Sequence, residues 1–144
     1  MTNAPRHLVA VAAAIADGNG RVLAIRRPQD GRWEPPGGLL ELDETILDGV
    51  RREAREETGL DVEPQALGAV YKNMTTSAVV LTFRCRVLGG SLTPNDEAGD
   101  FAWMTPDEVR QHMPEIFAQR VLDALAEGPP AVRTHDGVHI ARSP

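Results

Sequence analysis

A group of glutamates on one predicted helix constrains this chain more than any other feature. Helical spacing begins near Thr45 and ends at Gly59, and Glu53, Glu56 and Glu57 lie within it. At about 100° per residue, the three carboxylates fall within an arc of roughly 100° on the helix surface. We therefore expect a helix that directs three like charges the same way.

The apolar residues of this helix occupy the arc next to the glutamates, which places the acids at the border of the buried face. These residues are Ile46, Leu47, Val50 and Ala54. Like charges one helical turn apart cost roughly a few tenths of a kcal/mol even in water. A divalent cation would make the crowding favourable, and oxygen ligands without His or Cys select Mg²⁺ or Mn²⁺.

A glycine inside the same helix helps to decide between two interpretations of the acids. The alternative to a metal site is a solvated acidic face whose charges pair with arginines. Gly49 lies one turn before Glu53, and glycine in a helix interior costs about 1 kcal/mol relative to alanine. Its presence indicates that another group needs the space, and this favours the metal site.

The spacing of the segment resembles the Nudix box, G-x5-E-x7-R-E-U-x-E-E-x-G-U, in which U is a bulky aliphatic residue. The one departure is Ala54, which stands in an aliphatic position. On these residues the chain resembles the Nudix hydrolase superfamily, MutT-like members included, and residues 7–127 follow the family's element order. The matching positions are Gly38, Glu44, Arg52, Glu53, Glu56, Glu57, Gly59 and Leu60.

The resemblance implies a loop–helix–loop that binds a divalent metal, Mg²⁺ with Mn²⁺ as a substitute. The implied metal ligands are Glu53, Glu56, Glu57 and the backbone carbonyl of Gly38. A carboxylate accepts the proton of the attacking water, and Glu57, Glu53 and Glu97 are all eligible for this catalytic role. We favour Glu57 and take Glu97, on a downstream loop, as the second choice.

Three further residues of the box are expected to be structural. The resemblance implies that Glu44 and Arg52 form a pair that holds the loop against the helix. Gly59 suits the position after the last helical residue, where a left-handed backbone ends the helix.

Four residues outside the box are candidates for substrate binding. Arg26 and Arg27 end a predicted strand near the expected cleft, and one of them could hold a phosphate. Exposure to solvent at the end of a strand explains the presence of two arginines equally well. Trp33 could stack on a base, but a tryptophan beside the Pro-Pro-Gly-Gly loop is also a natural packing anchor. Tyr71 lies near the end of another strand, within reach of a substrate.

The order of elements predicts an α+β fold or a mixed α/β sandwich, and the resemblance specifies the α/β class, a Nudix-type α/β/α sandwich with a mixed sheet. We expect one domain over residues 1–127 and a C-terminal appendage over 128–144, with a short hairpin around Asp136-Gly137. The appendage could pair with an edge strand of a second subunit and form a homodimer. Strands are expected at 8–15, 21–26, 62–72, 77–88 and 101–104, a loop at 28–36, and further helices from 105 and over 114–127.

The composition bears on partners and location. The formal net charge of −6 and the pI of about 5.2 argue against a general nucleic-acid binder. No run approaches the roughly 18 apolar residues of a membrane span, so we expect neither a nucleic-acid nor a membrane partner. The apolar stretch at residues 8–16 reads as a strand and not as a signal segment, which predicts a cytoplasmic protein.

The resemblance implies a Mg²⁺-dependent hydrolase that cuts a diphosphate linkage by water attack on phosphorus. The expected substrate is a nucleoside triphosphate, a nucleotide sugar or a similar nucleoside diphosphate derivative. Some subfamilies of the superfamily are distinguished by a proline or a tyrosine after the box. In this chain Thr75 stands at the position of the proline, and residues 76–78 contain no tyrosine. Their absence favours a nucleoside triphosphate.

Two other functions on the same fold remain alternatives. One is a non-catalytic nucleotide-binding or regulatory module, but such modules usually lose acids of the box, and this chain keeps them. The other is an isopentenyl-diphosphate isomerase, which relies on a cysteine in its pocket. The only cysteine, Cys85, stands in the middle of a predicted strand among apolar residues.

Overall fold

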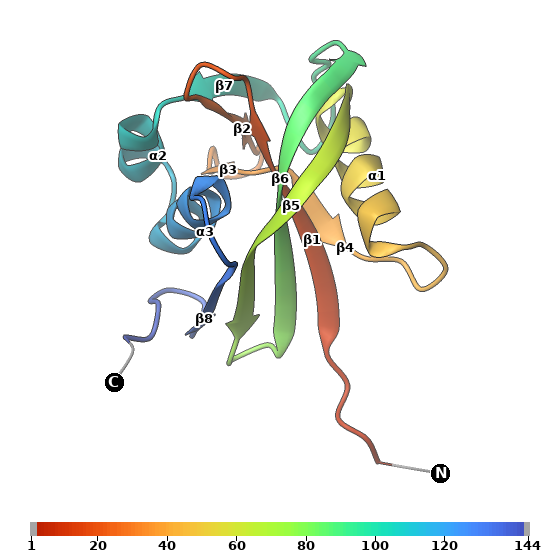
Figure 1. Cartoon of the computed structure of the whole chain (residues 1–144), viewed down its shortest axis with the longest axis vertical. Coiled ribbons are helices and arrows are strands. Elements are labelled where there is room, and N and C mark those ends of the chain that lie inside the picture. The colour runs from red at the N-terminus through yellow and green to blue at the C-terminus, as the bar shows by residue number, and fades with distance from the viewer. Residues whose placement is uncertain (1–2, 143–144) are drawn as a thin grey trace.

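The computed structural model describes residues 3–142 of the chain. Its strands form one sheet, and helices cover both faces of that sheet (Figure 1). The helices are α1 (Ile46–Thr58), α2 (Pro106–His112) and α3 (Glu115–Leu125). The strands are β1 (Leu8–Ala16), β2 (Val22–Arg26), β3 (Trp33–Glu34), β4 (Gly37–Leu39), β5 (Leu60–Asn73), β6 (Ala78–Gly90), β7 (Asp100–Met104) and β8 (Ala131–His135).

The sheet contains both parallel and antiparallel neighbours. Its strand order is β3-β2-β1-β6-β5-β8, with β4 also pairing with β1 and β7 with β2. Strands β1 and β6 run parallel, as do β5 and β8, whereas β1 pairs with β2 and β5 with β6 in antiparallel fashion. The predicted mixed sheet is therefore confirmed, and β1 and β2 form an antiparallel hairpin.

Helix α1 packs on one face of the sheet, and α2 and α3 pack on the other (Figure 1). Val50 of α1 belongs to the same apolar cluster as Ile15 of β1, while Val121 of α3 clusters with the neighbouring Ala14. Adjacent residues of β1 thus face opposite layers, as the pleat of a strand requires. This arrangement is the predicted α/β/α sandwich.

The ends of α1 follow the sequence signals. The Thr45 hydroxyl accepts a hydrogen bond from the Asp48 N–H at 3.1 Å, and Gly59 ends the helix with φ of 84°. Inside the helix, a Cβ on Gly49 would lie 2.5 Å from Leu40 Cδ1 and 3.1 Å from Glu44 Oε1. The group that needs the space at Gly49 is therefore the loop that precedes the helix.

Two segments differ from expectation. Trp33–Glu34, predicted as loop, forms the short strand β3 because it pairs with Ile25 and Arg26 of β2. The C-terminal segment adds a strand to the sheet that was not expected, since β8 pairs in parallel with β5 of the same chain. The predicted reversal at Asp136-Gly137 is present, and His135 forms an antiparallel bridge with Ile140 beyond it.

The helices within residues 3–142 are all too short or too polar to cross a bilayer. Homodimer formation through the C-terminal segment stays a prediction, and β8 stands at the end of the strand order, next to β5.

Candidate active site

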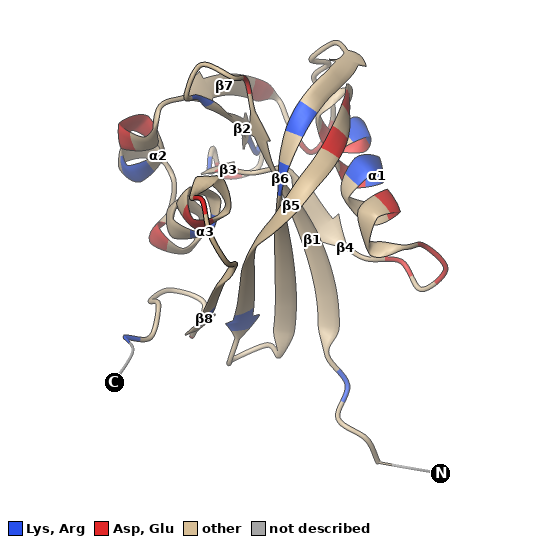
Figure 2. Ribbon diagram, in the orientation of Figure 1, with Lys and Arg blue, Asp and Glu red and all other residues tan. Residues whose placement is uncertain are grey.

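A groove of about 410 Å³ lies where β4 and the loop after it meet α1. Acidic residues gather on α1 and on the loop before it (Figure 2). The groove collects residues from four separate parts of the chain, since Arg27, Gly38 and Glu97 line it together with Glu53 and Glu56. Folding thus brings together four of the five predicted metal-ligating and catalytic residues, namely Gly38, Glu53, Glu56 and Glu97.

Gly38 lies directly against the Glu53 carboxylate. A Cβ built on Gly38 would be 2.6 Å from Glu53 Oε1 and 2.7 Å from Oε2. Any other residue at this position would therefore collide with the carboxylate or push it away. Glu53 itself is only 8% exposed, so the backbone of Gly38 and the carboxylate share a confined space at the edge of the sheet.

Glu57 lies deeper than Glu53, at 1% exposure. Its Oε1 accepts a hydrogen bond from the Gly37 N–H at 3.0 Å, while its Oε2 is buried without a partner among residues 3–142. Burial raises the pKa of the Glu57 carboxyl, and the adjacent Glu53 carboxylate raises it further. Two neighbouring buried carboxyl groups, one with an unused oxygen, form an environment that a cation would stabilise.

Glu56 adopts a different orientation from the other two acids. Its side chain is 59% exposed and accepts a hydrogen bond from Arg52 Nη1 at 3.2 Å. No group of three or more His, Cys, Asp or Glu side chains in the described part of the chain forms a metal-binding cluster. Arg52 Nη1 also donates to Glu53 Oε1 at 2.9 Å, so one guanidinium nitrogen bridges the Glu53 and Glu56 carboxylates, and Glu57 is the most buried of the three acids.

Arg52 connects the helix to the loop before it. Its Nε and Nη2 donate to the two carboxylate oxygens of Glu44 at 2.8 and 2.7 Å, and Nη2 also donates to the Leu39 carbonyl at 3.1 Å. These bonds to Arg52 lower the pKa of Glu44 to about 2. The contacts agree with the structural role that the motif predicts for this pair.

Asn95 positions the loop that carries Glu97. Its Oδ1 accepts hydrogen bonds from the N–H groups of Glu97 and Ala98 at 2.9 and 3.0 Å, and its Nδ2 donates to the Glu57 carbonyl at 2.8 Å. The loop is therefore fastened to the end of α1. Sequence reasoning missed this residue, although an Asn two residues before the acid is typical of such a turn.

Arg27 and Arg26 differ in their relation to the groove. Arg27 lines it and pairs with Glu34, a buried acid that the sequence did not single out. Arg26 is exposed, donates from Nε to the Gly31 carbonyl at 3.3 Å and lies 5.8 Å from the Trp33 ring. Trp33 packs against the apolar cluster on the α3 side of the sheet. This contact corresponds to the second interpretation of Trp33, a packing anchor.

Tyr71 is not available to a substrate, contrary to the prediction. Its side chain is fully buried, and its hydroxyl donates to Asp123 Oδ2 at 2.5 Å. Tyr71 does lie near the end of a strand, as predicted, but α3 covers the face of β5 on which this residue lies. Tyr71 is thus a core residue that joins β5 to α3.

Comparisons with known proteins agree with this fold. The NUDIX domain family matches residues 6–125. A MutT-like protein of Streptomyces ambofaciens is 50% identical over 139 residues, which cover 96% of this chain and 90% of that protein. The uncharacterized Nudix hydrolase YfcD of Escherichia coli K12 is 33% identical over 122 residues, with coverage of 78% of this chain and 66% of that protein.

Solved structures show the same fold. An ADP-ribose pyrophosphatase from Streptococcus suis superposes with a TM-score of 0.75 at 25% identity, covering 90% of this chain and all of that one. A UDP-X diphosphatase superposes with a TM-score of 0.72 at 21% identity, covering 91% of this chain and 69% of that one. The chain belongs to the Nudix family, and it is an enzyme of that family, a Nudix pyrophosphohydrolase.

Proposed function

We propose that this enzyme uses Mg²⁺ to hydrolyse a diphosphate linkage in a nucleoside diphosphate derivative, by attack of water on phosphorus. The observation that carries the proposal is the groove in which Gly38, Glu53 and Glu97 meet above the buried Glu57. Arg27 adds a cation at its wall, which suits a phosphate oxygen.

The residues at this groove fit a divalent metal. The unpartnered, buried Oε2 of Glu57 and the neighbouring Glu53 carboxylate supply hard oxygen donors, which Mg²⁺ and Mn²⁺ prefer. Glu53, Glu56, Glu57 and the backbone carbonyl of Gly38 would hold the ion. When bound, the metal neutralises the diphosphate and lowers the pKa of a coordinated water.

The protein's own groups have separate tasks in this reaction. Glu57 is our first choice as the base that takes the proton of the attacking water, and Glu97 is the second because it lines the same groove. Arg52 does not touch the substrate in this assignment but positions the loop of Gly38 through Glu44 and the Leu39 carbonyl. Arg27 orients a phosphate oxygen.

A nucleoside triphosphate is the substrate that we favour. The relative with 50% identity is MutT-like, and the sequence marks of other subfamilies are absent. Cys85 gives no support to an isomerase, because it is fully buried in the apolar cluster under α1. Burial also raises the pKa of the Cys85 thiol to about 12, so the thiol is protonated at neutral pH.

The test is a hydrolysis screen with resolved products. Nucleoside triphosphates, nucleotide sugars and dinucleoside polyphosphates are incubated with the enzyme and Mg²⁺ or Mn²⁺, and each product is separated by ion-exchange chromatography. We expect turnover of at least one class, with cleavage between two phosphates. Failure to cleave any of the three classes with either metal would refute the proposal.

A further inference from the structure

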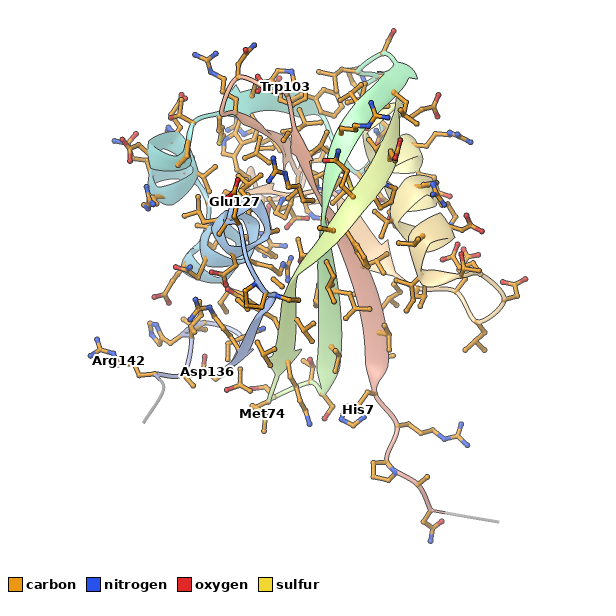
Figure 3. The ribbon with its side chains drawn as sticks, in the orientation of Figure 1. His7, Met74, Trp103, Glu127, Asp136 and Arg142 are labelled. Atoms are coloured by element: carbon orange, nitrogen blue, oxygen red, sulfur yellow. The ribbon has the colours of Figure 1, made fainter. Side chains whose placement is uncertain are left out.

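A second cavity, of about 530 Å³, lies between β6, α3 and the turn after β8. Its walls are mainly apolar and include Val80, Ile116, Phe117 and Val138. Backbone contacts fix the turn, since the Met74 N–H donates to the His135 carbonyl at 2.7 Å. Figure 3 shows Asp136, at this turn, close to the β5 end marked by Met74.

The cavity and the catalytic groove both share lining residues with a third hollow. A smaller hollow of about 230 Å³ shares Arg32, Phe117 and Arg120 with the large cavity. The same hollow shares Arg27 and Gly38 with the groove. A substrate whose diphosphate lies in the groove can therefore extend its remaining part along the hollow and into the large cavity.

Arg120 stands where the hollow and the large cavity meet. It is only 7% exposed, and its Nε has no hydrogen-bond partner among residues 3–142. Its guanidinium lies 5.1 Å from the centre of the Phe117 ring, which does not satisfy its N–H groups. Burial lowers the pKa of Arg120 to about 10, so the side chain is still a cation and a donor at neutral pH.

His135 supplies a second unpaired donor to the cavity. It is 6% exposed, and its Nδ1 accepts a hydrogen bond from the Gly137 N–H at 3.0 Å. Because Nδ1 is the acceptor in the neutral ring, Nε2 carries the hydrogen. Nε2 is buried and has no partner in the described part of the chain. Burial and the charge of Arg120 lower the pKa of His135, which keeps the ring neutral.

A ligand with acceptor atoms would satisfy these two buried donors, since unpaired buried polar groups are costly. The apolar walls suit a flat ring, and the volume lies in the range of small-molecule sites. An additional phosphate has the right acceptors but is strongly hydrated and gains little from such walls. A nucleobase that carries an oxo group meets both conditions.

We propose that the large cavity binds the nucleobase of the substrate, and that Arg120 and His135 select bases with an oxo group over bases with an amino group at the same ring position. The proposal rests on the proposed function and adds the class of base. An amino group would direct its own N–H toward two donors. His135 lies on β8, after the residues 6–125 that match the family, so this chain's C-terminal strand contributes to the selection.

The test compares matched substrates that differ at one ring position. Inosine and adenosine triphosphates differ in the oxo or amino group at C6, and uridine and cytidine triphosphates differ likewise at C4. We expect kcat/KM to favour the oxo member of at least one pair by about 10- to 100-fold, because a site built to hydrogen-bond one group rejects its replacement. A ratio near one for both pairs would overturn the proposal.

Variants assign the selectivity to the two donors. In Arg120→Met and in His135→Phe, the oxo-to-amino ratio should fall by about ten-fold, and Arg120→Lys should restore part of it. The ratio is unaffected by a uniform loss of folded enzyme. Arg110→Met is the matched control, because Arg110 lies on α2 and pairs with Asp107 at the surface. If both donor variants keep the ratio of the wild type, the assignment is wrong.

A binding measurement separates this proposal from the proposed function. Titration calorimetry with inosine and adenosine monophosphates needs no turnover. Tighter binding of the inosine nucleotide, lost in Arg120→Met, supports base selection even if no substrate is hydrolysed. An equal loss for both nucleotides would place Arg120 on the phosphate and overturn the proposal, whether or not the hydrolysis screen succeeds.

Discussion

The Arg52 guanidinium donates from Nε and Nη2 to the two carboxylate oxygens of Glu44, at 2.8 and 2.7 Å. A further bond from Nη2 reaches the Leu39 carbonyl at 3.1 Å. One side chain on α1 thereby holds both ends of the loop that leads from Gly38 to the helix. Because Gly38 lies against Glu53, the position of the loop and the shape of the proposed metal site depend on each other.

Glu44→Gln should change how stability depends on pH. The pKa of Glu44 is lowered from 4.5 to about 2 in the folded protein. Its ionised form therefore contributes stability that is fully present above about pH 4.5 and is lost as the pH falls through about 2. The difference in Tm between wild type and variant should be largest near neutral pH and shrink toward about pH 2. Thermal denaturation across this range measures it, and a constant difference would contradict the prediction.

Glu57→Gln should lower kcat by about 10²- to 10⁴-fold while the protein still folds. The amide has the same shape and removes the repulsion between Glu57 and the neighbouring Glu53 carboxylate. Steady-state kinetics with Mg²⁺ and circular dichroism measure the two effects. Glu63→Gln is the matched control, since Glu63 pairs with Arg86 at the surface. Turnover close to that of wild type in Glu57→Gln would remove Glu57 from the catalytic assignment.

Removal of divalent cations should abolish hydrolysis, and Mg²⁺ or Mn²⁺ should restore it. A cation that binds only the folded state also raises its stability, by RT ln(1 + [M²⁺]/Kd). We therefore expect Tm to rise with Mg²⁺ concentration in the wild type and to rise less in Glu57→Gln. Activity that persists in excess EDTA would count against a metal-dependent reaction.

Gly49→Ala should destabilise the protein by about 1–3 kcal/mol, although alanine is the better helix former. The added Cβ would lie 2.5 Å from Leu40 Cδ1 and 3.1 Å from Glu44 Oε1, so these side chains of the loop before α1 would have to shift. Gly89→Ala is the control, because a Cβ there meets no atom within 4 Å. Urea denaturation of both variants measures the free energies of unfolding. An equal effect of the two substitutions would show that space at Gly49 is unimportant.

Tyr71→Phe should affect stability and not catalysis. The hydroxyl of Tyr71 donates to the Asp123 carboxylate, and loss of such a bond to a charged acceptor lowers the free energy of unfolding by about 1–3 kcal/mol. We expect kcat and KM to stay within about two-fold of wild type. Such a factor corresponds to a change of well under 1 kcal/mol in the activation or binding free energy. A large rise in KM would return Tyr71 to the substrate contacts.

The sequence by itself determined the helix and the motif on it. Thr45 and Gly59 bound α1 through local hydrogen bonds and backbone conformation, and such local effects can be read from neighbouring residues. The spacing of Glu53 and Glu57 on one turn of helix is equally local. For the same reason most strands and helices could be predicted, because alternating and helical apolar patterns follow from periodicity along the chain, whereas the sandwich with a mixed sheet was implied by the resemblance.

Only the tertiary structure decided which of these groups are buried and what they meet. Tyr71 occupies a position on β5 that reads as accessible, and only the packing of α3 makes it a core residue. Arg120 and His135 are apart in the chain and face one cavity because β8 joins the sheet beside β5. Burial and contact between distant segments depend on strand order and layer packing, and no local pattern encodes these.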